Sequence, residues 1–175
     1  MSIEIVGGDL IAQITGGVFE MEEVPSLEIE GALDDSPASI IASHLMDESI
    51  LSLPSLEADW PLYISHLPDV PDVAVGIYNT TPIKDGRNMD DGSIMQHYGV
   101  ETVLRCRSEE AGWDKCNEIL TQLCAVHNAE TLLGAANYRI HNVSVIGGIN
   151  ALGEEPGTKR RKLFTMNFIT AINKV

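Results

Sequence analysis

Basic side chains are missing from the first half of this sequence. Among its 175 residues are 26 Asp or Glu but only 11 Lys or Arg, giving a formal net charge of −15, and the first basic residue is Lys84. Residues 1–83 carry 15 acidic residues, whereas the remainder has equal numbers of both signs. Nonspecific nucleic-acid binding depends on many Lys and Arg contacts with phosphates, and anionic membranes attract proteins through the same residues. The composition therefore argues against both kinds of binding.

Export signals and membrane spans are also missing. The N-terminus has Glu4 and Asp9 but no basic stretch ahead of an apolar one, so we expect no signal peptide, and no apolar run approaches the length of a membrane span. Cysteine is scarce: an odd count of three is typical of reduced thiols in a cytosolic setting. Because 44% of the residues are hydrophobic, the chain has enough apolar side chains for a core. We expect an acidic globular protein.

Signatures of catalysis, metal binding and cofactor binding are absent as well. The stretch from Gly153 to Lys159 lacks the spacing of a phosphate-binding loop and contains a proline and two acids. The cysteines form no Cys-x-x-Cys pair, the histidines form no His-x-x-x-His pair, and no Gly-x-Ser-x-Gly turn occurs. The sequence therefore predicts no catalytic, metal or cofactor residues and no enzymatic activity.

Two helices and five strands are predicted after the first 33 residues. Ser36 before Pro37, and Ser108 before two glutamates, are typical helix starts, and we expect these helices to end near Leu51 and His127. Strands are expected at residues 62–67, 73–78, 99–107, 138–149 and 163–172. This order predicts an α+β fold, with a mostly antiparallel sheet and the two main helices packed on one face.

The chain is predicted to divide into an arm and a domain. Residues 1–33 read as short strands separated by glycine pairs, which indicates a β-rich acidic N-terminal arm. Residues 34–175 are expected to form a single α+β domain. Its second helix has helically spaced apolar positions, which we expect to be buried: Trp113, Cys116, Leu120, Leu123 and Cys124.

Two turn-rich segments and one strand supply candidate contact residues. Residues 79–98 lack periodicity and are expected to form a long loop, which in a compact domain is usually functional or mobile. Residues 153–162 are expected to form a hairpin loop ending in four consecutive basic residues: Lys159, Arg160, Arg161 and Lys162. Alternation places Arg105 and Arg107 on the outward face of their strand. The basic tip is either a solvated turn or a contact with an acidic surface, and head-to-tail packing of like subunits into a ring would match it to the acidic half.

From about Ser36 onward the sequence resembles the tail-terminator (tail-completion) proteins of tailed bacteriophages, also called minor capsid proteins. Four stretches carry the likeness, namely PASIIASHLMDESI, KDGRNMDDGSIMQHYG, GVETVLRCRSEEAGWDKCNEILTQL and the closing RRKLFTMNFITAI. The resemblance is one of pattern and order, and it does not cover the first 33 residues.

The resemblance implies a structural role in the virion. Such proteins form a hexameric ring on the completed tail tube, stop the addition of tube protein and provide the surface that joins the neck or head-closure protein. On this hypothesis Lys84, Asp85, Arg87 and Met89 would face the tube protein or a neighbouring subunit. The protein would be assembled in the host cytoplasm and located in the tail or neck. Six copies would carry roughly −90 charges, so DNA would pass through the lumen without specific binding.

Two alternatives to a tail terminator remain open at this point. One is another ring protein of the head–tail joint, such as a head-closure or neck protein. The other, from a different class, is a small acidic enzyme or binding module of the host. The native mass separates them, because a monomer that never binds tail tubes would contradict the ring hypothesis.

Overall fold

The computed structural model describes residues 12–15, 18–21, 33–55, 58–87, 94–157 and 160–175. The chain divides into two compact units, Met1–Glu30 and Gly31–Val175. The smaller unit contains strands β1 (Ala12–Thr15) and β2 (Val18–Met21), which pair antiparallel in a two-stranded sheet. The other parts of the predicted β-rich arm, residues 1–11, 16–17 and 22–32, lie outside the described residues.

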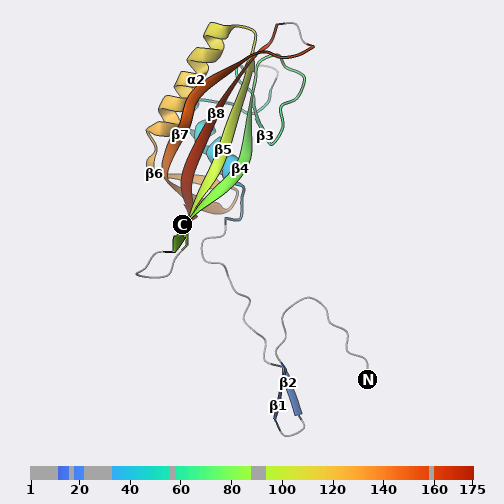
Figure 1. The fold of residues 1–175 in the computed structure, drawn as a ribbon, viewed down its shortest axis with the longest axis vertical. Helices are drawn as coiled ribbons and strands as arrows, with labels where there is room; N and C mark the ends of the chain where they lie inside the picture. Colours follow the sequence, from blue (N-terminus) through green and yellow to red (C-terminus); the bar gives the residue numbers. More distant parts are fainter. Residues whose placement is uncertain (1–11, 16–17, 22–32, 56–57, 88–93, 158–159) are drawn as a thin grey trace. The chain divides into compact units, whose positions relative to one another are not determined.

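The larger unit is built on a six-stranded sheet with the order β3-β4-β5-β8-β7-β6 (Figure 1). Its strands are β3 (Leu62–Ile64), β4 (Ala74–Arg87), β5 (Ile94–Cys106), β6 (His127–Leu133), β7 (Ala136–Glu154) and β8 (Lys162–Lys174). Only β3 and β4 pair in parallel, and the other neighbours are antiparallel. The predicted α+β class with a mostly antiparallel sheet is therefore confirmed.

Helix α1 (Pro37–Asp47) begins where the sequence predicts. The Ser36 hydroxyl accepts a hydrogen bond from the Ser39 backbone N–H at 3.2 Å, and Pro37 occupies the first turn. A second acceptor comes from the sheet, since the Asn79 side-chain oxygen receives the Ala38 N–H at 2.8 Å. The helix ends earlier than the predicted Leu51, because Ser49 turns the backbone to a φ of 60°.

Helix α2 (Glu109–Cys124) also starts at its predicted cap. The Ser108 hydroxyl accepts the Ala111 N–H at 3.3 Å, and two glutamates occupy the first turn, where the helix dipole favours negative charge. The predicted end near His127 is wrong by one turn, since β6 already begins at His127. In β6 the chain pairs with β7, a long-range contact that the local pattern does not reveal.

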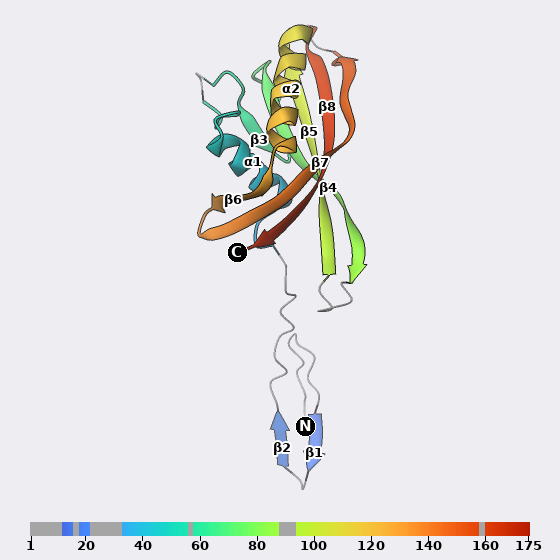
Figure 2. The same cartoon turned by 90° about the vertical axis from the view of Figure 1, so that its left-hand side faces the viewer.

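The core lies between the helices and one face of the sheet. Figure 2 shows α1 and α2 on the same side, and their buried residues form one cluster with the strands. The largest contributors are Ile41 and Leu45 of α1, Ile119 and Leu123 of α2, and Leu104, Tyr138, Phe164 and Phe168 of the sheet. Burying such apolar side chains contributes about 25 cal/mol per Å² removed from water. Both helices are thereby fixed against the sheet.

Two residues of α2 differ from the predicted apolar face. Trp113 is 46% exposed, and Cys124 is exposed as well. Cys116 is buried as expected, and burial raises the pKa of its thiol to about 12. The buried stripe is narrower than the apolar spacing suggests, because α2 packs mainly on the sheet and the side of the helix that carries Trp113 faces solvent.

The long loop predicted at residues 79–98 is the largest error of the sequence analysis. Most of it continues β4 and β5 as a hairpin, with pairs such as Ile83–His97 and Arg87–Ile94. Register shifts between Thr80 and Ile83, and again between Lys84 and Arg87, interrupt the alternation that marks a strand. Residues 88–93 lie outside the described part of the chain.

Candidate functional site

Arg105 lies on the sheet face opposite the helices, as alternation predicted, but it is only 1% exposed. The segment at residues 68–72 covers it, and its guanidinium donates hydrogen bonds to the carbonyl oxygens of Pro68 and Pro71. One of its nitrogens also lies 3.7 Å from a Glu155 carboxylate oxygen. The expected outward exposure of Arg105 is therefore wrong, because another part of the same subunit occupies that face.

Arg161 is buried next to Arg105 and does not project from a solvated tip. Its Nε lies 2.7 Å from Glu155 Oε2, and its Nη1 lies 3.5 Å from Asp72 Oδ1. The same Nη1 donates a hydrogen bond to the Asp69 carbonyl oxygen at 2.5 Å. These partners hold Arg161 within the subunit, so the prediction of an exposed basic residue here is wrong.

Arg107 extends the same group of charges to the surface. Its side chain is 75% exposed, in agreement with the predicted outward face, and its Nε donates to Asp72 Oδ2 at 2.7 Å. This hydrogen bond holds the pKa of Asp72 below its usual range. We call Arg105, Arg107, Arg161, Asp72 and Glu155 the arginine cluster. It joins the 68–72 segment to the β5 end and to the β7–β8 connection.

The remaining predicted contact residues fall into three groups. Arg160 is exposed and has a φ of 63°, and Lys162 forms an ion pair with Glu154 at 3.1 Å. Lys84, Asp85 and Arg87 belong to the far end of β4, for which the structure describes the backbone pairing with β5. Lys159 and Met89 lie outside the described residues. Among the predicted contact residues with described side chains, the structure brings Arg105, Arg107 and Arg161 together around Asp72 and Glu155.

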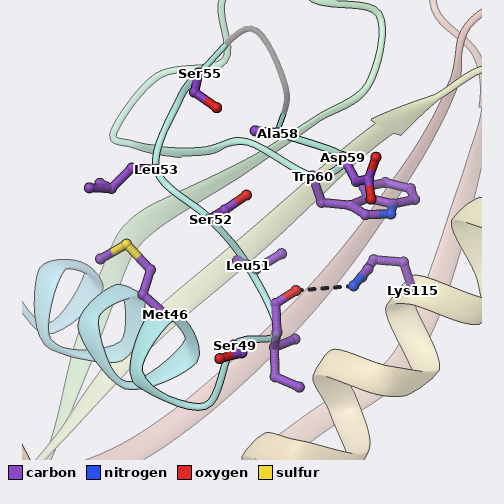
Figure 3. Close-up of a pocket in the computed structure, with 11 residues that line it drawn as sticks. Met46, Ser49, Leu51, Ser52, Leu53, Ser55, Ala58, Asp59, Trp60 and Lys115 are labelled. Carbon is purple, nitrogen blue, oxygen red and sulfur yellow. Dashed lines mark hydrogen bonds between the residues drawn. The ribbon is translucent and has the colours of Figure 1, made fainter.

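A surface recess lies between the end of α1, the segment that follows it, and α2 (Figure 3). It has a volume of about 770 Å³, and Met46, Leu53, Trp60 and Lys115 are among the residues that line it. Lys115 Nζ donates to the Ile50 carbonyl oxygen at 3.0 Å, pairs with Glu118 at 2.6 Å and lies 5.7 Å from the centre of the Trp60 ring. Because these groups already engage the lysine, we interpret it as a connection between α2 and the 50–60 segment.

The edges of the sheet are open along part of their length, which the sequence analysis missed. On one side, β3 pairs with β4 only at Val75–Ile77, so residues 79–87 have β5 as their sole strand neighbour among the described residues. On the other side, the pairing of β6 with β7 ends at Asn142, and within the described chain residues 143–154 pair only with β8. Open strand edges present unpaired backbone donors and acceptors to other chains.

Exposed apolar side chains accompany these open edges. Ile64 is 38% exposed on β3, and Leu132 is 63% exposed on β6. On β7, Ile146 and Leu152 are 48% and 60% exposed. The two β7 residues lie beside unpaired backbone, whereas groups of the same subunit engage part of the outward backbone of β3 and β6. Large apolar side chains beside unpaired backbone are typical of a surface that another protein covers. We therefore take the two edges as the candidate functional site, a surface for assembly.

Other classes of site receive no support from the described residues. Within the described ranges, no group of three or more His, Cys, Asp or Glu side chains is placed to hold a metal ion. No helix there is long and apolar enough to cross a membrane. No protein-family model matches the chain, and no curated protein matches it significantly.

Proposed function

We propose that this protein is a structural subunit of a bacteriophage virion, a ring that caps the completed tail tube and joins it to the neck. The single observation that carries the ring is the pair of open edges on opposite sides of one sheet. A subunit with two different adhesive edges associates head to tail, and a head-to-tail contact that closes makes a ring. The resemblance of residues 36–175 to tail terminators supports placing this ring at the end of the tail tube.

A ring of this kind acts through its surfaces and needs no reacting group. To stop the growth of a tube, one side of the ring must bind the last layer of tube protein. The other side must not bind a further layer of tube protein. The rigid sheet and its packed helices would hold both sides in fixed positions. The arginine cluster serves the same end, because its two buried guanidinium groups hold the 68–72 segment on the sheet through hydrogen bonds to backbone carbonyl oxygens.

Electron microscopy of the full chain mixed with purified tail tubes tests the proposal. We expect a ring on one end only, and we expect tubes capped in this way to stop incorporating added tube protein. Native mass measurement of the free protein should give a closed oligomer, with six copies as the expected number. A monomer that binds no tubes at any concentration would contradict the proposal, and a ring that binds neck protein but ignores tubes would favour a head-closure protein instead.

A further inference from the structure

The chain covers two of its own strand edges and leaves two others uncovered. On the outer side of β3, the Leu62 N–H donates to the Ser52 carbonyl oxygen at 2.9 Å. On the outer side of β6, the Leu132 carbonyl oxygen accepts a hydrogen bond from the Ser43 hydroxyl of α1 at 3.2 Å. Within the described part of the chain, the open parts of β4 and β7 have no such cover. Only these two edges are therefore available to another strand.

The open part of β7, residues 143–154, lacks the features that usually protect a strand edge. Edge strands are commonly kept from pairing with other chains by charged side chains or by proline. Residues 143–153 contain neither, although 21% of the whole chain is charged. Ile146 and Leu152 are 48% and 60% exposed on this strand. The β7 edge is thus an uncharged, partly apolar surface that can accept a strand along its length.

A second copy of the chain provides a strand that fits this edge. Residues 79–87 of β4 are the other uncovered edge of the described sheet. Strand β4 runs parallel to β8, whereas β7 runs antiparallel to it, so β4 of a copy in the same orientation would lie antiparallel to β7. Pro82 does not prevent this pairing, because it lies in the bulge between Thr80 and Ile83, a position where proline is tolerated.

Charge favours β4 of a second copy over a second β7. The end of β4 contains two basic residues, Lys84 and Arg87, against one acid. Helix α2 begins over the Ala151 end of β7, because Gly112 packs on Phe164, which pairs with Ala151. Three exposed acids in the first turns of this helix form no ion pair within the described ranges: Glu109, Glu110 and Asp114. Complementary charge of this kind determines which surfaces meet more than how tightly they bind.

We infer that β7 of one copy pairs antiparallel with β4 of the next, which continues the sheet around the ring. This inference rests on the ring proposed above and states which backbone surfaces build it. Thr80 and Ser144 lie in one row of paired residues, and the two open stretches extend from this row in opposite directions. The next copy must therefore be displaced along the strands, toward the β7–β8 connection.

This displacement suits a closed ring. It brings residues 83–87 of the next copy beside residues 147–153, and it carries the β3 strand of that copy past the end of β7. The same stagger at every junction inclines the strands to the ring axis, and strands in a closed sheet are inclined in this way. The two covered edges, β3 and β6, take no part in the contact.

Charged substitutions on β7 test the inference in the full chain. Ile146→Lys combined with Leu152→Lys should raise the concentration for half-assembly at least about tenfold, because lysine protects a strand edge from pairing. Leu132→Lys is the matched control, since Leu132 is 63% exposed on β6, where the subunit already engages the outer backbone. Circular dichroism checks that each variant is folded, and mass photometry measures the assembly. An unchanged ring in the double variant, or an equal effect of Leu132→Lys, overturns the inference.

Hydrogen exchange provides a second, direct measurement, in which the assembled protein is compared with the dissociated double variant. We expect assembly to slow amide exchange in residues 83–87 and 147–153 and to leave residues 62–64 and 127–133 unchanged. Protection of β7 without protection of β4 overturns the inference, because β7 would then pair with itself or with another protein.

The outcomes also separate the junction from the proposed function. A ring without protection at these strands overturns the junction alone. A ring that shows the protection on both strands but does not cap tail tubes contradicts the tail-terminator function and leaves the junction intact. A chain that stays monomeric overturns the ring and the junction together.

Discussion

At the scale of single residues, the guanidinium groups of the arginine cluster hold the backbone of the 68–72 segment in position. Arg105 and Arg161 are 1% and 9% exposed, and between them they engage three backbone carbonyl groups and the carboxylates of Glu155 and Asp72. A buried ion pair is costly to desolvate, so removing one member leaves the others without compensation. The cluster thus has a structural role, and its loss would free the 68–72 segment from the sheet.

Replacing Arg105 tests this role. We expect Arg105→Met to lower the free energy of unfolding by about 3–5 kcal/mol, because the Pro68 and Pro71 carbonyls lose their buried donor and Glu155 keeps only one of its two arginines. Arg107→Met is the matched control, and its exposed pair with Asp72 should cost no more than about 1 kcal/mol. Urea unfolding followed by circular dichroism measures both. Equal losses in the two variants would contradict the structural role of Arg105.

His44 predicts a dependence of stability on pH. Its ring is 4% exposed on α1, and burial lowers its pKa below 6.5 despite the opposing effect of Glu48 and Asp47. Below pH 6.5 the unfolded chain therefore binds a proton at His44 that the folded chain does not bind. The free energy of unfolding consequently falls as the pH falls, by up to about 1.4 kcal/mol per pH unit. Urea titrations between pH 8 and 5 measure this slope. His44→Gln should flatten it, and an equally steep slope in that variant would contradict the assignment to His44.

At the scale of elements, α2 lies unusually close to the sheet at Gly112. A Cβ atom added at this residue would come within 2.4 Å of a Phe164 ring carbon and 2.5 Å of Cys106 Sγ. Gly therefore allows the close packing of helix on sheet, although alanine has the better intrinsic helix propensity by about 1 kcal/mol. The packing requirement exceeds the local preference at this position.

Gly112→Ala should consequently destabilise the protein, against the usual trend for exposed helix positions. We expect a loss of about 1–3 kcal/mol in the free energy of unfolding, because the ring of Phe164 and the Cys106 thiol must shift to admit the methyl group. Asp114→Ala, at an exposed position of the same helix, should change stability by less than about 0.5 kcal/mol. Thermal and urea unfolding measure both variants, and a stabilising Gly112→Ala would show that α2 can move away from the sheet.

The elements also show what could be predicted from the sequence and what could not. The helix starts at Ser36 and Ser108 depend on residues next to each other, and both were predicted correctly. The extension of β4 and β5 was missed because Pro82 and two register shifts break the alternation. Strand β6 was missed because its seven residues include only two apolar ones besides Ala129, and its pairing with β7 supplies the stability.

The candidate site could be predicted only in part, for a physical reason. Charge alternation correctly assigned Arg105 to the face away from the helices, but the covering 68–72 segment is a tertiary contact without a local signal. The open edges follow from strand order and strand length together. Strands β3 and β6 lie at the two ends of the sheet, and each is shorter than the strand it borders. The sequence gives no local signal that Leu132 and Leu152 are exposed, because their burial depends on the strand order.

At the scale of the whole molecule, the uneven distribution of charge acquires a different meaning. The sequence suggests that the basic hairpin tip of one subunit meets the acidic half of the next. Of the eight Lys and Arg residues whose side chains the structure describes, however, seven form ion pairs within the subunit: Arg105, Arg107, Lys115, Arg139, Arg161, Lys162 and Lys174. Among these eight, only Arg160 forms no ion pair within the subunit. Copies with a net charge of −15 would repel one another at long range.

Salt should therefore strengthen the assembly. Raising the ionic strength from about 0.02 M to about 0.5 M shortens the screening length several-fold and weakens repulsion between the acidic copies, while hydrogen bonds and apolar contacts along the strand edges are little affected. We expect the concentration for half-assembly to fall, as measured by mass photometry across a sodium chloride series. Arg160→Glu, which changes an exposed cation, should leave the direction of this trend the same. If salt instead dissolves the assembly, ion pairs between subunits dominate its contacts, and the open strand edges are not its main source of affinity.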